Sequence, residues 1–456
     1  MESIINNIGF GIFIYFSMLW VGYTFFLLGT YITIMRKHKA SEFNNIMSKF
    51  NQRASLPITV IIPAFNEERR IKNAITAILN ADYKNINVVV VNDASTDGTL
   101  QLLIDTYMLK KIPAAFKKKI KTSDVYAYYQ SSIFNLIVVD KQHCPLASSA
   151  ADSINAGLNV CRTPIFMTVD ADTIVEPEAI TRMLYMYLTH THCIAIGGDI
   201  YIPDAFQMKD SELLEDDIPF NLVVGVQGCE YLRSFSYGRE GGRFLGGALC
   251  HPGAFTMFET EAVIRVGGYD PQNFSYNAEI IIRLHHRMRN KQYPYSMIYS
   301  PSSIAWSEGP HTVRQLWHQR NQWQRGLLRC LFRYKEMVLN PKYGVAGLLA
   351  FPYYILFEAL GPIVEAISYI LLVFVLWFKT ISLAHLAWLF FIAWGYMMLM
   401  TLSCVVLNLL THSKRYKKRD ILHLFVLTTV DMLFYRQVKA FCALTATIQY
   451  FIHRMR

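Results

Sequence analysis

Charged side chains are scarce in this sequence: Asp, Glu, Lys and Arg make up 17% of its 456 residues, whereas hydrophobic residues make up 53%. Two long stretches, residues 8 to 35 and residues 384 to 410, contain none of these four charged types. A helix needs about 20 apolar residues to cross a bilayer, and both stretches are long enough. The composition therefore excludes an ordinary soluble protein and predicts membrane-spanning helices near both ends of the chain.

The sequence also lacks paired cysteines, because its eight cysteines are scattered and form no Cys-x-x-Cys motif. This excludes a disulfide framework and a structural zinc site, and it fits a reducing compartment. The formal net charge is +10, but no zinc-finger spacing or interleaved aromatic and basic pattern indicates a nucleic-acid partner. Lys and Arg instead cluster beside the apolar stretches, which indicates contact with membrane lipids.

The position of the basic residues predicts the orientation of the first span. Residues 1–36 are predicted to be an uncleaved transmembrane anchor, because the basic cluster at residues 36–39 follows the apolar run instead of preceding it. The positive-inside rule then predicts that the chain enters the cytoplasm at this cluster. We therefore expect residues 50–340 to form a cytoplasmic domain of a multi-pass protein of the cell inner membrane.

The C-terminal part fits the same orientation. Residues 361–411 predict two transmembrane helices, which lead out of the cytoplasm and back. Residues 412–456 begin with a dense basic loop, as the positive-inside rule requires on the cytoplasmic side, and continue into membrane-associated helices. Residues 343–360, which contain Pro352, predict an interfacial helix. Glu365 is the one acidic residue of the first C-terminal span, which makes it a functional candidate.

The cytoplasmic domain alternates short β-branched runs with helical patterns. Strands are predicted at residues 56–62, 87–91, 134–139 and 165–169, with helices at residues 67–80, from residue 99, and at residues 151–158. Such alternation predicts an α/β fold with a doubly wound, mostly parallel sheet, whose ligands lie at the carboxyl ends of the strands.

Polar side chains follow three of these predicted strands. Asn66 and Glu67 follow the first, Asp93 ends the second, and Asp170 and Asp172 follow the fourth. Taken alone, Asp93 could simply cap the next helix, and an isolated Asp-x-Asp is more often a turn than a metal site. Because all of them fall at carboxyl ends of strands in one sheet, they predict one crevice that binds a divalent cation and phosphates.

These motifs resemble those of a known family. Pro-Ala-Phe-Asn-Glu-Glu at residues 63–68, Val-Val-Val-Asn-Asp-Ala-Ser-Thr-Asp-Gly-Thr at residues 89–99 and Asp-Ala-Asp at residues 170–172 resemble the signature of family 2 glycosyltransferases, which have the GT-A fold. Residues 253–269 resemble the acceptor-side segment of that family, and residues 318–326 its Gln-x-x-Arg-Trp motif. The anchor and C-terminal spans resemble the membrane-integrated branch, which includes cellulose, hyaluronan and poly-N-acetylglucosamine synthases.

The resemblance implies roles on the donor side. Pro63, Asn66, Glu67 and Asp93 would contact the uracil and ribose of a UDP-sugar, and Asp170 would lie near the nucleotide. The donor would be a hexosyl or N-acetylhexosaminyl nucleotide.

On the metal and acceptor side, the resemblance implies that Asp172 binds magnesium or manganese together with the diphosphate. Gln319, Arg320 and Trp323 would line a polysaccharide or lipid-linked acceptor, with the indole stacked on a sugar ring. The reaction would be an inverting transfer, in which a carboxylate deprotonates the acceptor hydroxyl and the metal stabilises the departing diphosphate.

Two departures from the family pattern concern cations. Ala150 stands where the family has a lysine that meets the diphosphate, so a phosphate-binding charge is missing. Gln322 replaces the arginine of the tryptophan motif, and Arg325, nearly one turn further on, is the residue that could compensate.

The third departure concerns the general base. Counting back from Arg283 places Asn277 at the position of the family aspartate, and asparagine cannot accept the proton. Glu279 lies two residues further on. It could substitute if the segment is a loop, whereas on a helix it would point about 200° away from Asn277.

Two functions therefore remain open from the sequence. One is a membrane glycosyltransferase that uses a UDP-sugar and a divalent cation. The other is a catalytically impaired relative that serves as a binding or scaffolding subunit for a partner transferase. A transporter is disfavoured, because three clear spans are few for a secondary carrier.

Overall fold

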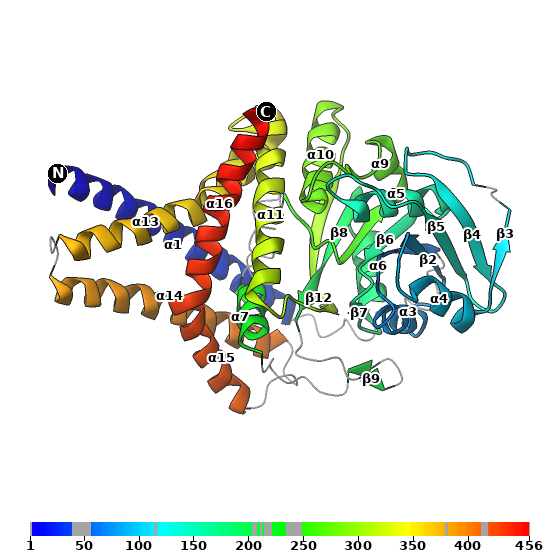
Figure 1. The fold of residues 1–456 in the computed structure, drawn as a ribbon, viewed down its shortest axis with the longest axis horizontal. Coiled ribbons are helices and arrows are strands. Elements are labelled where there is room, and N and C mark those ends of the chain that lie inside the picture. The colour runs from blue at the N-terminus through cyan, green and yellow to red at the C-terminus, as the bar shows by residue number, and fades with distance from the viewer. Residues whose placement is uncertain are drawn as a thin grey trace.

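The fold is an α/β domain joined to an arm of long helices (Figure 1). The computed structural model describes residues 2–38, 56–113, 116–202, 208–209, 212–213, 221–233, 249–378, 382–411 and 418–455. Most of the basic loop expected after residue 411, and the ends of the N-terminal and C-terminal basic clusters, lie outside these residues.

A ten-stranded mixed sheet forms the centre of the α/β domain. In spatial order its strands are β3 (Leu109–Ile112), β4 (Val125–Ser131), β5 (Leu136–Lys141), β2 (Ile86–Asp93), β1 (Ile58–Ala64), β6 (Ile165–Val169), β11 (Phe255–Glu259), β8 (Cys193–Tyr201), β12 (Ser296–Ser307) and β7 (Thr173–Val175). The four central strands β5, β2, β1 and β6 are parallel, which confirms the predicted doubly wound core. Strand β11 runs antiparallel to both β6 and β8.

Helices cover both faces of this sheet. Those packed on one face are α3 (Ile71–Leu79), α4 (Thr99–Tyr107) and α6 (Ala179–Thr189), and those on the other are α5 (Ser149–Val160), α9 (Thr260–Arg265) and α10 (Tyr276–Asn290). Along β1, Val60 and Ile62 point into the first core and Ile61 into the second. This alternation explains why a central strand is apolar along its whole length.

The observed elements differ from the predicted ones mainly at their ends. The strand at residues 165–169 was predicted with its true bounds, whereas the first strand is shifted by two residues to Ile58–Ala64. Between α4 and β5 the chain forms the hairpin β3–β4, where no strand was predicted from the sequence. This hairpin lies at the end of the domain opposite the helical arm, so its lysines are far from the apolar helices (Figure 1).

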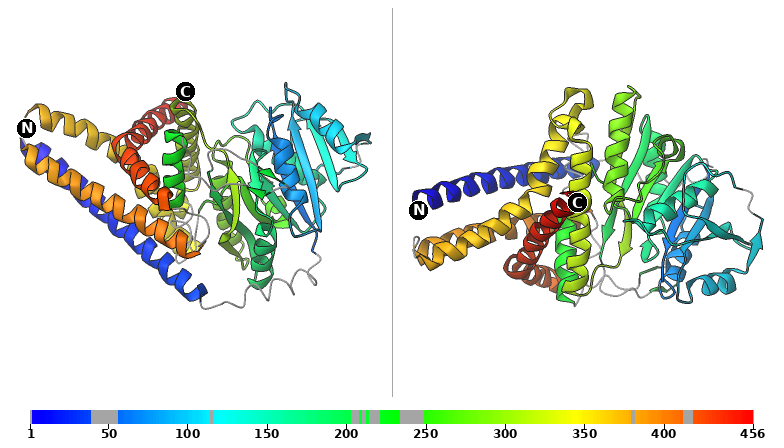
Figure 2. Two further views of the ribbon diagram at one scale, coloured as in Figure 1. Left: turned by 90° about the horizontal axis from the view of Figure 1, so that it is seen from below. Right: turned by 45° about the horizontal axis from the view of Figure 1, so that its top comes forward.

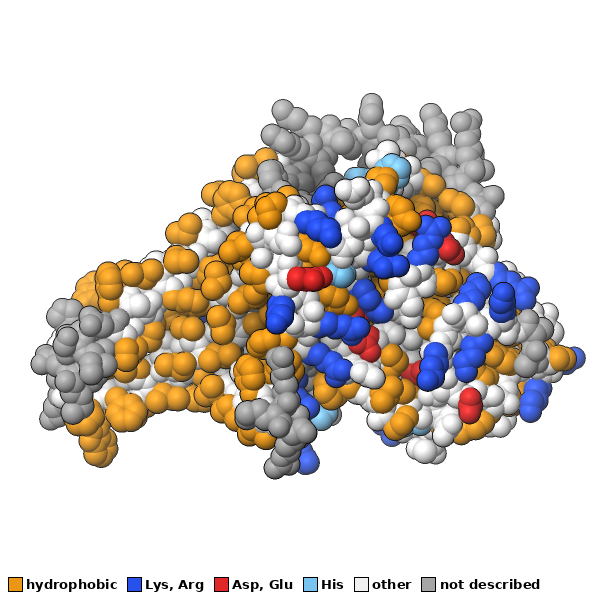
Figure 3. Space-filling model, turned by 90° about the horizontal axis from the view of Figure 1, so that it is seen from above, with side chains coloured by type: hydrophobic (Ala, Val, Ile, Leu, Met, Phe, Trp, Pro, Cys, Tyr) orange, Lys and Arg blue, Asp and Glu red, His pale blue; other side chains and the backbone are white. Residues whose placement is uncertain are grey.

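Among the described residues, three helices are long and apolar enough to cross a membrane, with candidate spans at Ile8–Ile32, Ala346–Trp377 and Ala387–Cys404. They belong to α1 (Glu2–His38), to the run ending in α13 (Gly361–Trp377) and to α14 (Leu383–Thr411). Hydrophobic side chains cover this arm, whereas Lys and Arg gather on the α/β domain (Figure 3). The N-terminus, the end of α13 and the start of α14 lie together at the tip of the arm, far from the α/β domain (Figures 1 and 2).

A layer of helices connects the arm to the sheet. It consists of α7 (Leu222–Tyr231), α11 (Val313–Arg333), α15 (Lys418–Val430), the π-helical turn η6 (Asp431–Tyr435) and α16 (Arg436–Met455). Helix α16 packs along both α11 and α13. Residues 343–360, predicted as an interfacial helix, contain η4 (Ala346–Ala350), α12 (Phe351–Tyr353) and η5 (Tyr354–Ala359). These elements lead directly into α13. The remaining short elements are β9 (Met208–Lys209), β10 (Glu212–Leu213), η2 (Lys335–Met337) and η3 (Pro341–Tyr343).

Candidate active site

The loops after β1 and β2 interlock through their own polar side chains. Asn66 has a φ of +58°, and its side-chain oxygen accepts a hydrogen bond of 2.8 Å from the backbone N–H of Thr96. The backbone N–H of Asn66 donates to Ser95 Oγ at 3.0 Å, and Gly98 N donates to Glu68 Oε2 at 3.0 Å. Pro63 lies in β1 just before this loop. Asn66 therefore braces the loops, and its predicted contact with the nucleoside stays a prediction.

Asp93 ends β2 and is buried beside two basic side chains from the neighbouring strand and its loop. Lys141, at the end of β5, is fully buried and forms an ion pair with Asp93 Oδ1; its Nζ also lies 3.0 Å from Asp152 Oδ2. His143 Nδ1 lies 2.7 Å from Asp93 Oδ2. Lys141 thus brings a cation to the base of the crevice, but it neutralises Asp93 and does not replace the lysine missing at Ala150.

Two exposed rings flank the entrance to Asp93. Phe65 follows β1 and is 44% exposed, and its ring centre lies 5.1 Å from that of His143, with the planes inclined at 37°. Neither ring was among the predicted site residues. Phe65 stands between the predicted site residues Pro63 and Asn66, which is the signal that could have found it, whereas His143 follows β5, whose end carries no predicted site residue.

Asp170, Asp172 and Glu67 form an acidic group at the adjacent ends of β6 and β1. Burial, with the charges of Asp172 and Glu67, raises the pKa of Asp170 to about 7. Burial, with the charge of Asp172, likewise raises the pKa of Glu67 to about 7. Burial also raises the pKa of Asp172, although hydrogen bonds from Thr173 Oγ1 (3.2 Å) and Ser307 Oγ (3.3 Å) oppose this. The three carboxylates are therefore difficult to ionise together without a cation.

The acidic group fits a divalent cation that is bound jointly with a ligand. Within the described ranges, no three His, Cys, Asp or Glu side chains meet closely enough to hold a metal by themselves. Oxygens from a diphosphate would have to complete the coordination of a cation held by Asp172. A bound cation would also relieve the repulsion that raises these pKa values.

We expect this acidic group to make the metal-free chain less stable as the pH rises. A carboxyl whose pKa is raised to about 7 by folding holds a proton that the unfolded chain has already released above about pH 4. The free energy of unfolding should therefore fall between pH 4 and pH 7 because of these groups. Thermal unfolding in EDTA at pH 5.5 and pH 8 measures this, and manganese added together with UDP should restore stability at pH 8. An Asp170→Asn variant that kept the full decrease would contradict it.

A cavity of about 710 Å³ begins beside Asp170 and Asp172 and continues between the helices of the arm. Its wall includes Asn277 and Trp323 on the side of the α/β domain. On the side of the arm, the wall is formed by aromatic and acidic side chains: Tyr23, Tyr353, Tyr354, Phe357, Glu358 and Glu365. One continuous space therefore links the acidic group with the apolar helices.

Asn277 and Glu279 point to different environments because α10 already begins at Tyr276. Asn277 lines the cavity and packs closely on Gly253, where an added Cβ would lie 1.7 Å from Asn277 Nδ2. Glu279 is completely buried away from the cavity wall. It forms an ion pair with Arg283 at 2.7 Å and accepts a hydrogen bond of 2.7 Å from Tyr334 Oη. The loop that would let Glu279 replace Asn277 is thus absent from this described segment, and we do not retain Glu279 as the base.

A Glu279→Gln substitution should therefore affect stability and leave the chemistry of the site unchanged. Removing the charge leaves Arg283 without its buried partner, which should cost roughly 2–4 kcal/mol in the free energy of unfolding. Denaturation of the full chain in detergent measures this cost. Nucleotide binding per folded molecule should equal that of the wild type, and a selective loss of turnover in the folded variant would restore Glu279 as a catalytic residue.

Helix α11 carries the predicted acceptor residues. It starts with a capping box between Thr312 and Gln315. Gly326 lies so close to the backbone of Ser275 that a Cβ added at residue 326 would be 2.4 Å from Ser275 N. This approach sets α11 against the start of α10. Gln319, Gln322 and Trp323 all line the cavity. Gln322 lies 3.1 Å from His318 through their side-chain nitrogens, while Arg325 stacks on Phe274 at 4.9 Å.

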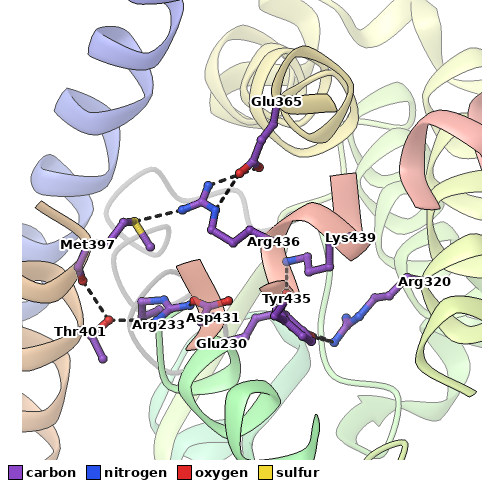
Figure 4. A network of polar contacts seen from close by, with 10 residues as sticks. All are labelled: Glu230, Arg233, Arg320, Glu365, Met397, Thr401, Asp431, Tyr435, Arg436 and Lys439. Atoms are coloured by element: carbon purple, nitrogen blue, oxygen red, sulfur yellow. Dashed lines mark hydrogen bonds and ion pairs between the residues drawn. The ribbon is translucent and has the colours of Figure 1, made fainter. Parts of the chain in front are cut away.

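Arg320 connects α11 to a network of charges between the helices (Figure 4). Its Nη2 lies 2.8 Å from Glu230 Oε2, and Lys439 pairs with the other oxygen of Glu230. Burial would raise the pKa of Glu230, but the charges of Arg320 and Lys439 lower it to about 2. Further pairs join Arg233 to Asp431 and Arg436 to Glu365. Sequence patterns did not identify Glu230 or Lys439, because no motif relates their helices.

The fold and the polar residues at its strand ends are similar to those of glycosyltransferases of the GT-A type. The family described as "Glycosyl transferase family 2" matches residues 59–112, which contain the interlocked loops and Asp93. The fold is similar to that of a mannosyltransferase from Pyrobaculum calidifontis in complex with GDP-Man and Mn²⁺, with a TM-score of 0.50 at 16% identity, over 90% of this chain and 99% of that one. The chain therefore contains a family 2 glycosyltransferase domain with the GT-A fold.

More specific relatives are polysaccharide synthases. The poly-beta-1,6-N-acetyl-D-glucosamine synthase of Staphylococcus aureus (strain COL) is 24% identical over 299 residues, which are 66% of this chain and 60% of the relative. The synthase of the same name from Staphylococcus epidermidis is 21% identical over 296 residues, covering 65% of this chain and 60% of the relative. The chain is thus homologous to a polysaccharide synthase and spans about 60% of the length of these relatives.

Proposed function

We propose that the protein transfers a sugar, with inversion, from a UDP-sugar to a polysaccharide or lipid-linked acceptor at the cell inner membrane. UDP-N-acetylglucosamine is the first donor to test, because the relatives are named as N-acetylglucosamine polymer synthases. The observation that carries the proposal is the cavity, which extends from Asp170 and Asp172 past Trp323 to the apolar helices. A donor at one end and an acceptor chain at the other fit such a space.

On the donor side, Pro63, Asn66, Glu67 and Asp93 would surround the nucleoside, with Asp170 beside it. Asp172 would hold the magnesium or manganese ion that binds the diphosphate. When bound, this ion supplies charge stabilisation for the departing UDP. Support for this assignment comes from the order of β2, β1 and β6, which are neighbours in the sheet and carry these residues at or just after their carboxyl ends.

On the acceptor side, Gln319, Arg320 and Trp323 would hold the sugar that receives the transfer. The indole offers an apolar face to a sugar ring, while Gln319 Oε1 is a buried acceptor for which the described residues provide no hydrogen-bond donor. A sugar hydroxyl in the cavity could supply that donor. In the transfer the acceptor oxygen bonds to the anomeric carbon, the bond from that carbon to the phosphate oxygen breaks, and the hydroxyl proton must leave.

The membrane assignment is part of the same proposal. The apolar arm would sit in the bilayer with the α/β domain on the cytoplasmic side. Support comes from the tip of the arm, where the N-terminus, the end of α13 and the start of α14 lie together (Figure 1). The N-terminus and the connection between α13 and α14 would lie on the non-cytoplasmic side of the membrane if the basic clusters lie in the cytoplasm.

A second function, a binding or scaffolding subunit, is favoured by the environment of the base position. Asn277 cannot accept a proton, and Glu279 is enclosed by Arg283 and Tyr334. In this alternative the crevice retains a nucleotide, and a partner subunit performs the transfer.

One experiment separates the two functions. The full chain in lipid nanodiscs is incubated with radiolabelled UDP-sugars, manganese and oligosaccharide acceptors, and UDP binding is measured by calorimetry in parallel. Labelled product together with binding supports the transferase. Binding of UDP without product, across several donors and acceptors, supports the subunit. A chain that neither binds UDP nor forms product would contradict both.

A further inference from the structure

The C-terminal helix α16 supplies a lysine to the acceptor end of the cavity, although it lies more than a hundred residues after the tryptophan of α11. We propose that Glu230 and Lys439 are positioning residues, which together hold Arg320 against Trp323 and so fix the indole that receives the acceptor sugar. This inference rests on the proposed function and adds α7 and α16 to the acceptor site.

Glu230 is the centre of the arrangement because both of its oxygens are used (Figure 4). Oε2 lies 2.8 Å from Arg320 Nη2 and accepts a hydrogen bond of 2.5 Å from Tyr435 Oη. Oε1 pairs with Lys439 Nζ. The side chains of Glu230 and Arg320 are each only 9% exposed, so water competes little with this pairing.

Arg320, which Glu230 holds in place, also contacts the Trp323 ring. Its guanidinium lies 4.1 Å from the centre of the Trp323 ring, the spacing of a cation–π contact. The same guanidinium is held by Glu230 and by Tyr435 Oη at 3.2 Å, so it cannot turn away without breaking both contacts. Arg320 therefore contacts the indole from a fixed position, beside the cavity that Trp323 lines.

Lys439 determines how Glu230 is oriented. The neighbouring pairs Arg233–Asp431 and Arg436–Glu365 use other carboxylates, so Lys439 and Arg320 are the two charged groups paired with Glu230 in the described network. The Lys439 side chain is 32% exposed, which makes it easier to replace without unfolding than Arg320. Loss of Lys439 should free one oxygen of Glu230, allow the carboxylate to rotate and loosen the Arg320–Trp323 contact.

The test uses the full chain in nanodiscs with the variants Lys439→Met, Lys439→Arg, Glu230→Gln and Trp323→Ala. Binding of a short β-linked N-acetylglucosamine oligosaccharide is measured by calorimetry, which requires no turnover; UDP binding and the acceptor KM and kcat are measured beside it. Arg182→Met is the matched control, because Arg182 pairs with Glu178 at the start of α6, outside the cavity wall, and its side chain is 25% exposed.

We expect Lys439→Met to weaken oligosaccharide binding roughly tenfold and to raise the acceptor KM by a similar factor, which lies within the range of coupling between contacting residues. UDP binding should stay within about twofold of the wild type, and Lys439→Arg should restore most of the loss. Added to Trp323→Ala, Lys439→Met should cause no further loss, because both act through the same indole.

Three results would overturn the inference: unchanged oligosaccharide binding in Lys439→Met, equal losses of UDP and oligosaccharide binding, or full additivity with Trp323→Ala. If Glu230→Gln does not fold, Lys439→Met and its double variant decide the question. Oligosaccharide binding that depends on Lys439 in a chain without UDP binding or turnover would support the inference and contradict the proposed transferase.

Discussion

Replacement of Asp172 by Asn should reduce sugar transfer at least about a thousandfold, because the departing diphosphate would lose the carboxylate that anchors its metal ion. Asp172 lies at the edge of the cavity, held by hydrogen bonds from Thr173 and Ser307 that keep its side chain in place. An amide of the same shape keeps these contacts but removes the charge. Initial rates with UDP-N-acetylglucosamine over a range of manganese concentrations measure the effect.

Stability provides the control for this prediction. Burial, and then the charge of Asp172, raise the pKa values of Asp170 and Glu67, so neutralising Asp172 should leave the metal-free chain at least as stable as the wild type. Asp105→Asn, on the exposed face of α4, is the matched substitution and should change neither property. An Asp172→Asn variant with wild-type turnover at saturating manganese would show that the diphosphate is stabilised elsewhere.

The central sheet could be predicted from the sequence because its signals are local. A run such as Ile58–Ala64 is apolar on both faces, and the polar residues that follow it mark the end of the strand. The parallel order of β5, β2, β1 and β6 then brings Asp93 and Asp170 to one edge. For this part of the site, strand ends are sufficient to identify the crevice.

Contacts between distant helices could not be predicted in the same way. Glu230, Arg320 and Lys439 stand on three helices whose mutual packing depends on side chains along their whole length. The pairing of Lys141 with Asp93 is similar, since nothing in the apolar run before Lys141 indicates that its amine turns inward toward a neighbouring strand. Charges of this kind are recognisable only after the fold has placed them.

The orientation of Glu279 could be predicted only in part from the sequence. If the segment is a helix, its period of 3.6 residues makes residues 277 and 279 face different directions. The sequence alone did not show whether the segment is a helix. The structure starts α10 at Tyr276, and this one boundary assigns Asn277 to the cavity and Glu279 to the interior. Neither residue can therefore serve as the proton acceptor of the proposed reaction, and no other side chain is assigned to this role.

Asn277→Asp should increase turnover by roughly 10- to 100-fold if proton removal limits the transfer, since a positioned general base typically contributes at least that much. The asparagine already lines the cavity, and its close contact with Gly253 leaves room for a side chain of the same shape. The carboxylate would face the space where an acceptor hydroxyl approaches the donor. Its activity should rise with pH as the new carboxyl ionises, which a pH–rate profile of kcat measures.

Asn290→Asp, at the far end of the same helix, is the matched control and should leave turnover unchanged. The proposed transferase also requires the gain to depend on Asp172, so the Asn277→Asp and Asp172→Asn double variant should fall to the level of Asp172→Asn alone. A folded Asn277→Asp variant that binds UDP but shows no gain would mean that another step, or another group, limits the reaction. A large gain would instead show that this chain keeps a complete donor crevice and lacks chiefly the carboxylate that accepts the proton.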